Sequence, residues 1–184
     1  LQEYMKNNYE LINNLKEIKS VADKIDELNN LDNSDFNIAT AYFSLGGFEI
    51  LYPKIKNSSH VKLLLGSEPR ESEHKLRSLL KNERVDLNKV EISNLLSRLT
   101  TDINLTSSEK NNIENIKTFI EWIERENVEV KILKKNFLHG KAYFSNKLNY
   151  TILGSSNMTT GGFLKNTELN LFADDMEITK ETND

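Results

Sequence analysis

The chain has 184 residues, which suits one domain with a sizeable core and is short for two ordinary ones. Its 38% hydrophobic and 28% charged residues favour neither a disordered chain nor a coiled-coil rod, and 24 basic against 28 acidic residues exclude a uniformly basic coat for nucleic acid. The chain has no cysteine, and no apolar run approaches the roughly 18 residues of a membrane span, so we expect a soluble cytoplasmic protein without disulfides, thiolate metal sites or a membrane partner.

The first third of the chain predicts a helix followed by two strands. Apolar residues at steps of three and four predict an N-terminal helix within residues 1–30. They are Leu11, Leu15, Ile18, Ala22, Ile25 and Leu28. Residues 36–43 are rich in strand formers and predict a buried first strand, which leads through Gly46 and Gly47 into a short helix containing Pro53. Residues 61–65 predict the second strand.

The middle third predicts helices and one further strand. Residues 71–104 are charged and amphipathic, which favours helices on the outside of a sheet, and Thr106 with Glu109 has the spacing of a capping box before a helix that reaches Arg125. Residues 128–133 predict the third strand. Strands that alternate with helices favour an α/β fold, which we expect to be a mixed sheet flanked by helices.

In the last third, short strands enclose a polar loop. Residues 138–144, 150–153 and 167–173 predict strands, and a hairpin-like turn separates the first two. Residues 154–162, GSSNMTTGG, form a loop of small hydroxyl, amide and glycine residues, and the acidic tail 174–184 is expected to fray. We expect one domain over residues 1–184 with its core in 36–173. Because the first residue is Leu, we also expect this domain to be a piece of a longer protein.

Candidate catalytic residues follow from this organisation. On a strand, His139 and Lys141 would project from the same face because side chains two residues apart do so. Imidazole can attack phosphorus and a lysine can neutralise the developing oxyanion. The GSSN turn adds donors for phosphate oxygens, and a carboxylate can hold the imidazole in its reactive tautomer. The turn supplies Ser155, Ser156 and Asn157, and Glu168 supplies the carboxylate. Each residue alone has an ordinary structural explanation, so the hypothesis rests on their combination.

These residues also resemble a known family. His139-x-Lys141, the GSSN turn and the NTELN stretch look like the HxK half-motif of the phospholipase D superfamily, and most like its small nuclease-type domains. Residues 36–51 and 61–69 resemble the first strand, glycine turn and second strand of the phospholipase-D-like domains found at the N-termini of bacterial helicases and in some restriction endonucleases. The resemblance covers residues 36–173.

The resemblance implies a mechanism. His139 would attack phosphorus to form a phosphohistidine that water hydrolyses without a metal, while Lys141, Ser155 and Asn157 bind the phosphate oxygens and Glu168 orients His139. The full family motif carries an Asp seven residues after the His, where this chain has Asn146. Nuclease branches often lack that Asp, so the departure favours a nuclease over a lipase.

The charge distribution supports a polyanionic substrate. Six lysines and no acidic residue lie between positions 131 and 166. They are Lys131, Lys134, Lys135, Lys141, Lys147 and Lys165. Lysines that contact phosphates release counterions and supply most of the sequence-independent affinity for nucleic acid, so we include Lys134 and Lys135 among the substrate-binding residues. A strand edge protected by lysines is the alternative interpretation.

We therefore expect a phosphodiesterase that acts on DNA, or on RNA, as a homodimer. We expect no cofactor and no metal, because the sequence contains no HxH, HExxH or DxD motif, and we take His60 and His74 as surface residues. The alternative is a non-catalytic nucleic-acid-binding or dimerisation module that serves a helicase or restriction region of the same longer chain. A phosphatidyl transferase is disfavoured because only one HxK, His139-x-Lys141, is followed by a GSSN turn, and because the chain shows no membrane-anchoring segment.

Overall fold

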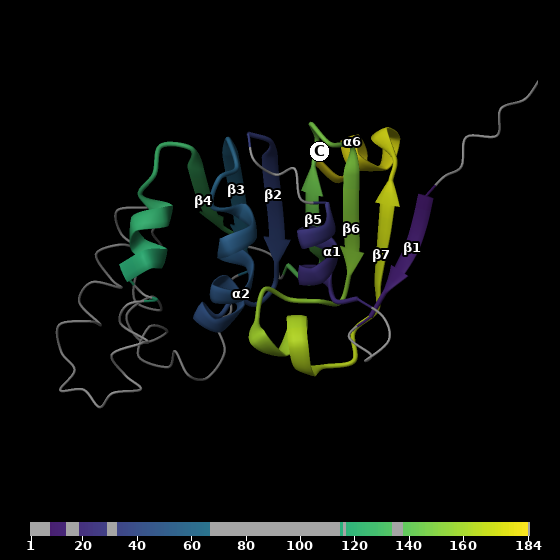
Figure 1. Cartoon of the computed structure of the whole chain (residues 1–184), viewed down its shortest axis with the longest axis horizontal. Coiled ribbons are helices and arrows are strands. Elements are labelled where there is room, and N and C mark those ends of the chain that lie inside the picture. Colours follow the sequence, from purple (N-terminus) through teal and green to yellow (C-terminus); the bar gives the residue numbers. More distant parts are fainter. Residues whose placement is uncertain are drawn as a thin grey trace, which may run out of the picture.

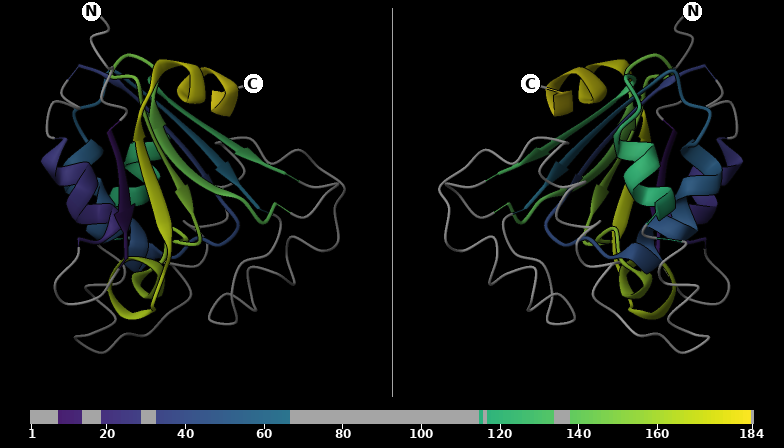
Figure 2. Two further views of the ribbon diagram at one scale, coloured as in Figure 1. Left: turned by 90° about the vertical axis from the view of Figure 1, so that its right-hand side faces the viewer. Right: turned by 90° about the vertical axis from the view of Figure 1, so that its left-hand side faces the viewer.

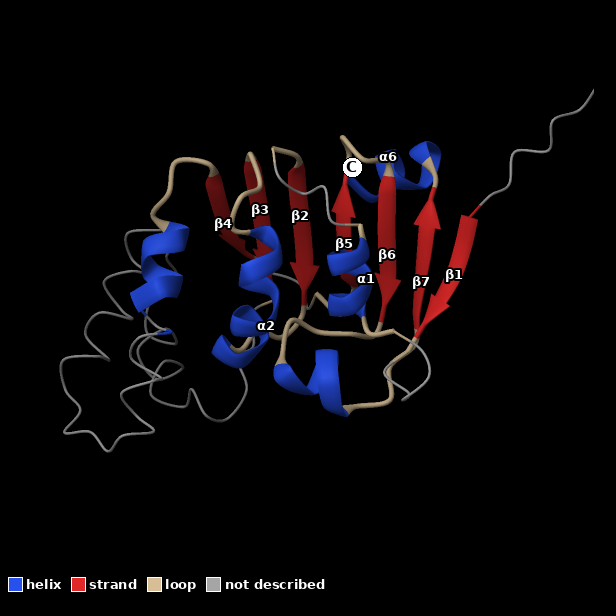
Figure 3. Ribbon diagram, in the orientation of Figure 1, coloured by secondary structure: helices blue, strands red, loops and turns tan. Residues whose placement is uncertain are grey.

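A computed structural model describes residues 8–13, 19–28, 33–66, 115, 117–133 and 138–183. In this part of the chain, seven strands form one mixed sheet in the order β1-β7-β6-β5-β2-β3-β4 (Figures 1 and 3). Their bounds are β1 Asn8–Ile12, β2 Asp35–Thr40, β3 His60–Leu65, β4 Val128–Ile132, β5 Lys141–Ser145, β6 Tyr150–Gly154 and β7 Asn170–Asp174. Strands β2, β3 and β4 are parallel, whereas all other neighbouring pairs are antiparallel. The predicted α/β class with a mixed sheet is confirmed.

Helices cover the sheet unequally on its two faces. The described helices are α1 Val21–Glu27, α2 Leu45–Ile55, the short π-helix η2 Gly161–Lys165 and α6 Met176–Asn183, and residues 117–123 are also helical. Figure 2 shows α1, α2 and the 117–123 helix on one face, with α6 across the other face near one end of the strands. There the hydroxyls of Thr151 and Thr179 are 3.1 Å apart, which ties α6 to β6. No helix in the described part is long and apolar enough to cross a membrane.

The core lies between the sheet and the helices α1, α2 and 117–123. Every second side chain of β2 and β3 points into it, and Phe36, Ile38 and Leu63 are fully buried as a result. On the helix side, the ring of Phe48 lies 5.0 Å from that of Phe119 and 5.3 Å from that of Trp122. These large rings bury much apolar area, and they fix α2 and the 117–123 helix over the parallel half of the sheet.

The N-terminal prediction was partly wrong. Residues 8–12 form the edge strand β1, which pairs with β7, and the helix begins only at Val21. The periodic leucines that suggested a long helix also fit a strand, because Leu11 is exposed and its neighbour Ile12 is buried. The true helix start is marked by Ser20, whose side chain accepts from the Asp23 N–H while the Asp23 carboxylate accepts from the Ser20 N–H.

The remaining elements follow the prediction with two corrections. Strands β2, β3, β4 and β6 and helix α2 lie where expected, and Pro53 is accommodated inside α2. The acidic tail does not fray, because residues 176–183 form α6 and its Thr179 is buried against β6. Strands β5 and β7 each begin three residues later than expected. The predicted helices of 71–104 and the capping box at Thr106 and Glu109 lie outside the described residues.

A single carboxylate holds the turn between β5 and β6. Asp35, the first residue of β2, accepts hydrogen bonds from the N–H groups of Asn146 and Lys147 at 3.0 and 2.9 Å and from the Ser145 hydroxyl at 2.9 Å. Burial alone would raise the pKa of Asp35, but these donors and the Asn37 amide bring the pKa below its ordinary value of 3.8. Asn146, which stands where the motif that this sequence resembles carries an Asp, is thus held by a carboxylate from another strand.

Replacing Asp35 should therefore weaken the fold in a pH-dependent way. Because its folded-state pKa is lowered, the ionised group stabilises the protein above pH 3.8, and this stability is lost as the pH falls through the lowered pKa. We expect Asp35→Asn to reduce the free energy of unfolding by about 2 kcal/mol at pH 7 and to flatten the loss of stability below pH 4. Urea denaturation at pH 7 and pH 3 measures both. Asp174→Asn, at an exposed strand carboxylate, is the control, and equal effects of the two variants would contradict the assignment.

Candidate active site

The predicted site residues come together at one end of the sheet. Here β2 and β6 end while β5 and β7 begin, as Figure 1 shows above η2. In the strand register Lys141 lies opposite Gly154, and Gly154 lies opposite Asn170. The HxK segment, the GSSN turn and the stretch with Glu168 are therefore neighbours in space, although 27 residues separate Lys141 from Glu168 in the sequence.

Lys141 is the buried cation of the site. It is the first residue of β5, and its Nζ donates a hydrogen bond to the backbone carbonyl of His139 at 2.6 Å. Burial lowers the pKa of Lys141, and the negative charge of nearby Glu168 partly offsets that effect. A partly desolvated ammonium interacts strongly with an incoming anion because little water screens it. Lys141 thus has the position and environment of a phosphate ligand.

His139 is placed differently from the prediction. Residues 138–140 precede β5 and form no strand, so His139 and Lys141 do not share a strand face. The reason is that β6 offers no further partner, since its last residue, Gly154, already pairs with Lys141. The His139 side chain is exposed, whereas that of Lys141 is buried. An exposed imidazole at the rim beside a buried cation remains accessible to a substrate.

Glu168 also lies outside its predicted strand, two residues before β7. Its carboxylate accepts from the Ser155 hydroxyl at 2.5 Å and from the side-chain amide of Asn166 at 3.1 Å. Ser155 is fixed in turn, because its Oγ accepts from the Leu169 N–H at 2.9 Å and its own N–H donates to the Leu169 carbonyl at 3.1 Å. Glu168 and Ser155 therefore form one hydrogen-bonded unit, and the role of Glu168 in orienting His139 stays a prediction.

Ser156 faces the interior of the protein. Its Oγ accepts from the Asn170 side-chain amide at 2.9 Å, and its N–H donates to the Asn170 Oδ1 at 3.1 Å. Its carbonyl accepts from the Tyr143 hydroxyl at 2.9 Å. Ser156 is fully buried, and burial raises the pKa of Tyr143, so the phenol stays a neutral donor. This geometry gives Ser156 a part in holding the turn, and we keep Ser155 rather than Ser156 for the substrate.

Asn157 lies between the interior and the site. Its Oδ1 accepts from the backbone N–H of Tyr42 at 3.0 Å, and the Thr40 hydroxyl is 3.5 Å away. The segment that follows packs closely against glycines. A Cβ on Gly47 would lie 2.3 Å from the Met158 carbonyl oxygen, and one on Gly162 would lie 2.3 Å from that of Asn157. The glycines in SLGG and TTGG thus let α2 and η2 approach the turn that carries Asn157.

The lysines do not form one patch around the site. Lys141 belongs to the site, and Lys165 is exposed at the end of η2, next to the Asn166 that binds Glu168. Lys147 lies at the opposite end of β5 and donates to the Asn33 carbonyl, and Lys131 on β4 contacts Glu129 at 2.7 Å. Lys134 and Lys135 lie outside the described residues. The described basic charge near the site is therefore smaller than the sequence suggested.

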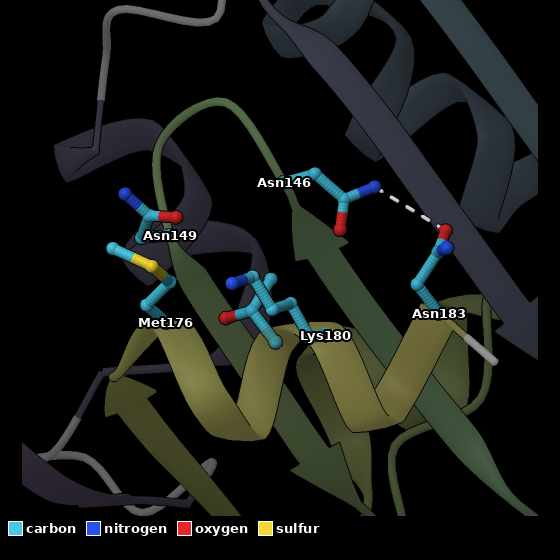
Figure 4. A pocket seen from close by; sticks show the side chains of 6 residues that line it. Asn146, Asn149, Met176, Lys180 and Asn183 are labelled. Atoms are coloured by element: carbon cyan, nitrogen blue, oxygen red, sulfur yellow. Dashed lines mark hydrogen bonds between the residues drawn. The ribbon is translucent and has the colours of Figure 1, made fainter.

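A shallow pocket lies at the far end of the sheet from these residues. Figure 4 shows it between the β5–β6 turn and α6, with a volume of about 410 Å³. Its lining residues are Asn146, Asn149, Met176, Thr179, Lys180 and Asn183. Among the described residues, no three His, Asp or Glu side chains come close enough to hold a metal ion. Metal independence itself stays a prediction.

Sequence reasoning missed the buried residues whose side chains hydrogen-bond the backbone of the GSSN turn and of Met158 after it. Thr40, Tyr143 and Asn170 are all buried polar residues within or at the ends of strands. Asn170 gave a signal, because an amide in an apolar strand is unusual, but the general excess of asparagine in this chain obscured it. Thr40 and Tyr143 gave none, because both residue types are common in strands.

Comparison with known proteins now defines the family. Residues 25–184 match the family described as cardiolipin synthase, PLD-like domain. The chain belongs to the phospholipase D superfamily. The match is wider than the sequence resemblance, since it includes the last three residues of α1 and all of α6. A comparison with curated protein sequences gives no match.

Solved structures of this superfamily share the fold at low sequence identity. NucT from Helicobacter pylori is 14% identical with a TM-score of 0.53, over 97% of this chain and 92% of that one. Nuc from Salmonella typhimurium, a phospholipase D family member, is 12% identical with a TM-score of 0.53, over 97% and 90%. Phosphatidylserine synthase from Haemophilus influenzae Rd KW20 is 15% identical with a TM-score of 0.54, over all of this chain but 39% of that one. These likenesses establish the PLD-like fold.

Proposed function

We propose that this protein is a phosphodiesterase that cleaves DNA through a covalent intermediate on His139. The observation that supports it best is the meeting of Lys141, Ser155, Asn157 and Glu168 at the sheet end next to His139, in a chain of the phospholipase D superfamily. A buried cation, a hydroxyl, an amide and a carboxylate beside an exposed imidazole form a donor set suited to a phosphate group.

The proposed reaction has two steps. In the first, an imidazole nitrogen of His139 attacks phosphorus, a P–N bond forms, and the P–O bond to the leaving group breaks as that oxygen takes a proton. In the second, water attacks phosphorus, the P–N bond breaks, and His139 is restored. Lys141 and the Asn157 amide would bind the non-bridging oxygens. Binding of a phosphate oxygen to Ser155 would free Glu168 from that hydroxyl to orient His139.

DNA is the proposed substrate because lysines predominate in this part of the sequence. No acidic residue interrupts the six lysines between positions 131 and 166. Exposed Lys165, together with Lys134 and Lys135, would contact phosphates on either side of the scissile bond. RNA presents the same phosphodiester, so both polymers belong in the assay. A helicase or restriction region of a longer chain is the partner that we propose for targeting.

A phospholipid is the second candidate substrate. Leu169 follows Glu168 directly and is 63% exposed, and Leu164 near the end of η2 is 57% exposed. Exposed leucines next to a phosphate site suit acyl chains, and the matching family is described as cardiolipin synthase. DNA remains our first proposal, because no acidic residue interrupts the six lysines between positions 131 and 166. Release of a soluble headgroup from vesicles, with no DNA cleavage, would favour the lipid.

The first prediction is that catalysis needs no metal. The proposed nucleophile, cation and amide donors are all side chains, so cleavage of plasmid DNA or of bis-p-nitrophenyl phosphate should continue at its full rate in excess EDTA. A known Mg²⁺-dependent nuclease, assayed in parallel, controls for complete chelation. Activity that disappears with EDTA and returns with Mg²⁺ would contradict the proposal.

The second prediction concerns His139. His139→Ala should reduce cleavage at least about a thousandfold, because it removes the nucleophile, while the fold and most DNA affinity remain. His60→Ala is the matched control, since His60 begins β3 at the opposite end of the sheet and should leave the rate unchanged. If His139→Ala cleaves like the wild type, the catalytic role is wrong. If neither protein cleaves but both bind DNA, the binding-module alternative is correct.

The third prediction is that the active unit is a homodimer with one composite site. In-line displacement needs a nucleophile on one side of phosphorus and a general acid on the other, and one imidazole cannot fill both positions. Only one HxK, His139-x-Lys141, lies at the site, because His60-x-Lys62 is on β3 and His60 begins that strand at the opposite end of the sheet. A two-fold axis that brings two copies of His139 together would therefore supply both groups. We expect specific activity to fall on dilution as light scattering reports dissociation. A monomer that keeps its full specific activity would rule out the composite site.

A further inference from the structure

The direction of the Asn157 amide is set by its neighbours. A backbone N–H can only donate, so the atom of Asn157 that lies 3.0 Å from the Tyr42 nitrogen must be Oδ1. This fixes the amide against flipping and turns Nδ2 the other way. Among the described residues Nδ2 makes no hydrogen bond, so both of its protons are available to a ligand. An amide held in this way is already oriented before the phosphate arrives.

The hydroxyl of Thr40 lies where the groups that hold Asn157 meet. Thr40 ends β2 and is completely buried. Its Oγ1 donates to the Tyr42 carbonyl at 2.9 Å and accepts from the Met158 N–H at 3.0 Å. One atom thus joins the residue that orients the Asn157 amide to the residue that follows Asn157 in the chain.

Two further contacts hold the same pair of segments together. The Ser44 N–H donates to the Met158 carbonyl at 3.0 Å, and Phe43 and Met158 form an isolated parallel bridge. Both contacts are between backbones and would survive a change of the Thr40 side chain. The Thr40 hydroxyl therefore helps to align the two segments rather than to hold them together.

We propose that Thr40 is a positioning residue that acts through Asn157 and keeps the Asn157 Nδ2 directed toward the substrate phosphate. This inference rests on the proposed function, since it takes Asn157 as a phosphate ligand. Without the hydroxyl, the Met158 N–H and the Tyr42 carbonyl lose a buried partner and the segment around Asn157 moves to find others. A small movement is enough to lose a hydrogen bond, because its strength falls steeply with angle and distance.

Thr151 offers a matched comparison. Like Thr40, it is a fully buried strand threonine with a hydrogen-bonded hydroxyl, but its partner is Thr179 of α6 at the other end of the sheet. Thr40→Val and Thr151→Val each remove one buried hydroxyl and keep the volume, so Thr151→Val controls for the loss of a buried hydroxyl away from the site. Only Thr40→Val should weaken phosphate binding.

The test measures binding of inorganic phosphate to the full chain by calorimetry, and cleavage of bis-p-nitrophenyl phosphate in parallel. We expect Thr40→Val to bind phosphate about tenfold more weakly, which corresponds to the loss of one hydrogen bond, and Thr40→Ser to restore most of the affinity. In an Asn157→Ala background, Thr40→Val should change the affinity by less than about twofold, because its effect passes through Asn157.

A second variant guards against a Thr40→Val protein that does not fold. Asn157→Asp keeps an acceptor for the Tyr42 N–H and replaces Nδ2 with a carboxylate oxygen. It should fold as well as the wild type and lose phosphate binding. Unchanged phosphate affinity in Thr40→Val or in Asn157→Asp would overturn the inference, as would additive effects in the double variant. If the wild type binds phosphate but cleaves nothing, the proposed function fails, whereas this inference is judged on affinity alone.

Discussion

Buried backbone groups at the ends of strands must find hydrogen-bond partners. In this protein the side chains that supply those partners lie beneath the candidate site. Where β2 and β6 end, the chain leaves the sheet and its N–H and carbonyl groups lose their ladder. Thr40 and Asn170 supply the missing partners, for Met158 in one case and for Ser156 in the other. Because each side chain bridges two segments, satisfying the backbone also fixes the GSSN turn relative to the sheet. The same bonds serve stability and the site.

In this arrangement, the residues that hold the GSSN turn in place differ from those that could contact a substrate. Ser156, Tyr143 and Thr40 are buried and have hydrogen-bond partners, whereas His139 and Ser155 are exposed at the rim. A buried polar network is stable only when it is fully satisfied, so it tolerates few arrangements and gives the turn a defined shape. Groups at the rim can exchange their partners for substrate oxygens at low cost, because water also reaches them.

The sequence predicted the strands that a local apolar pattern marks. It missed the strand ends and contacts that depend on how distant segments pair. Apolar runs located β2, β3, β4 and β6, and the spacing of His139, Lys141, GSSN and Glu168 pointed to segments that the structure brings to one end of the sheet. The edge strand β1 was read as a helix, because its pairing with β7 is a contact between the two ends of the chain that no local pattern records. His139 and Glu168 were placed on strands that begin later, since strand ends depend on where the partner strand stops. Asp35 was not recognised as the group that holds the β5–β6 turn, because it lies 111 residues from Asn146.

The burial of Lys141 distinguishes it electrostatically from the exposed lysines of the chain. A buried ammonium near Glu168 contributes little to the long-range field, because the carboxylate cancels much of its charge at a distance. In the proposed reaction it would act at contact, where little water would screen its effect on one phosphate group. Attraction of a polyanion to a protein of net charge -4 must then come from exposed lysines such as Lys165. Salt should therefore weaken binding of the polymer more than the chemistry at the bound phosphate, since screening acts on exposed charges and spares the buried one.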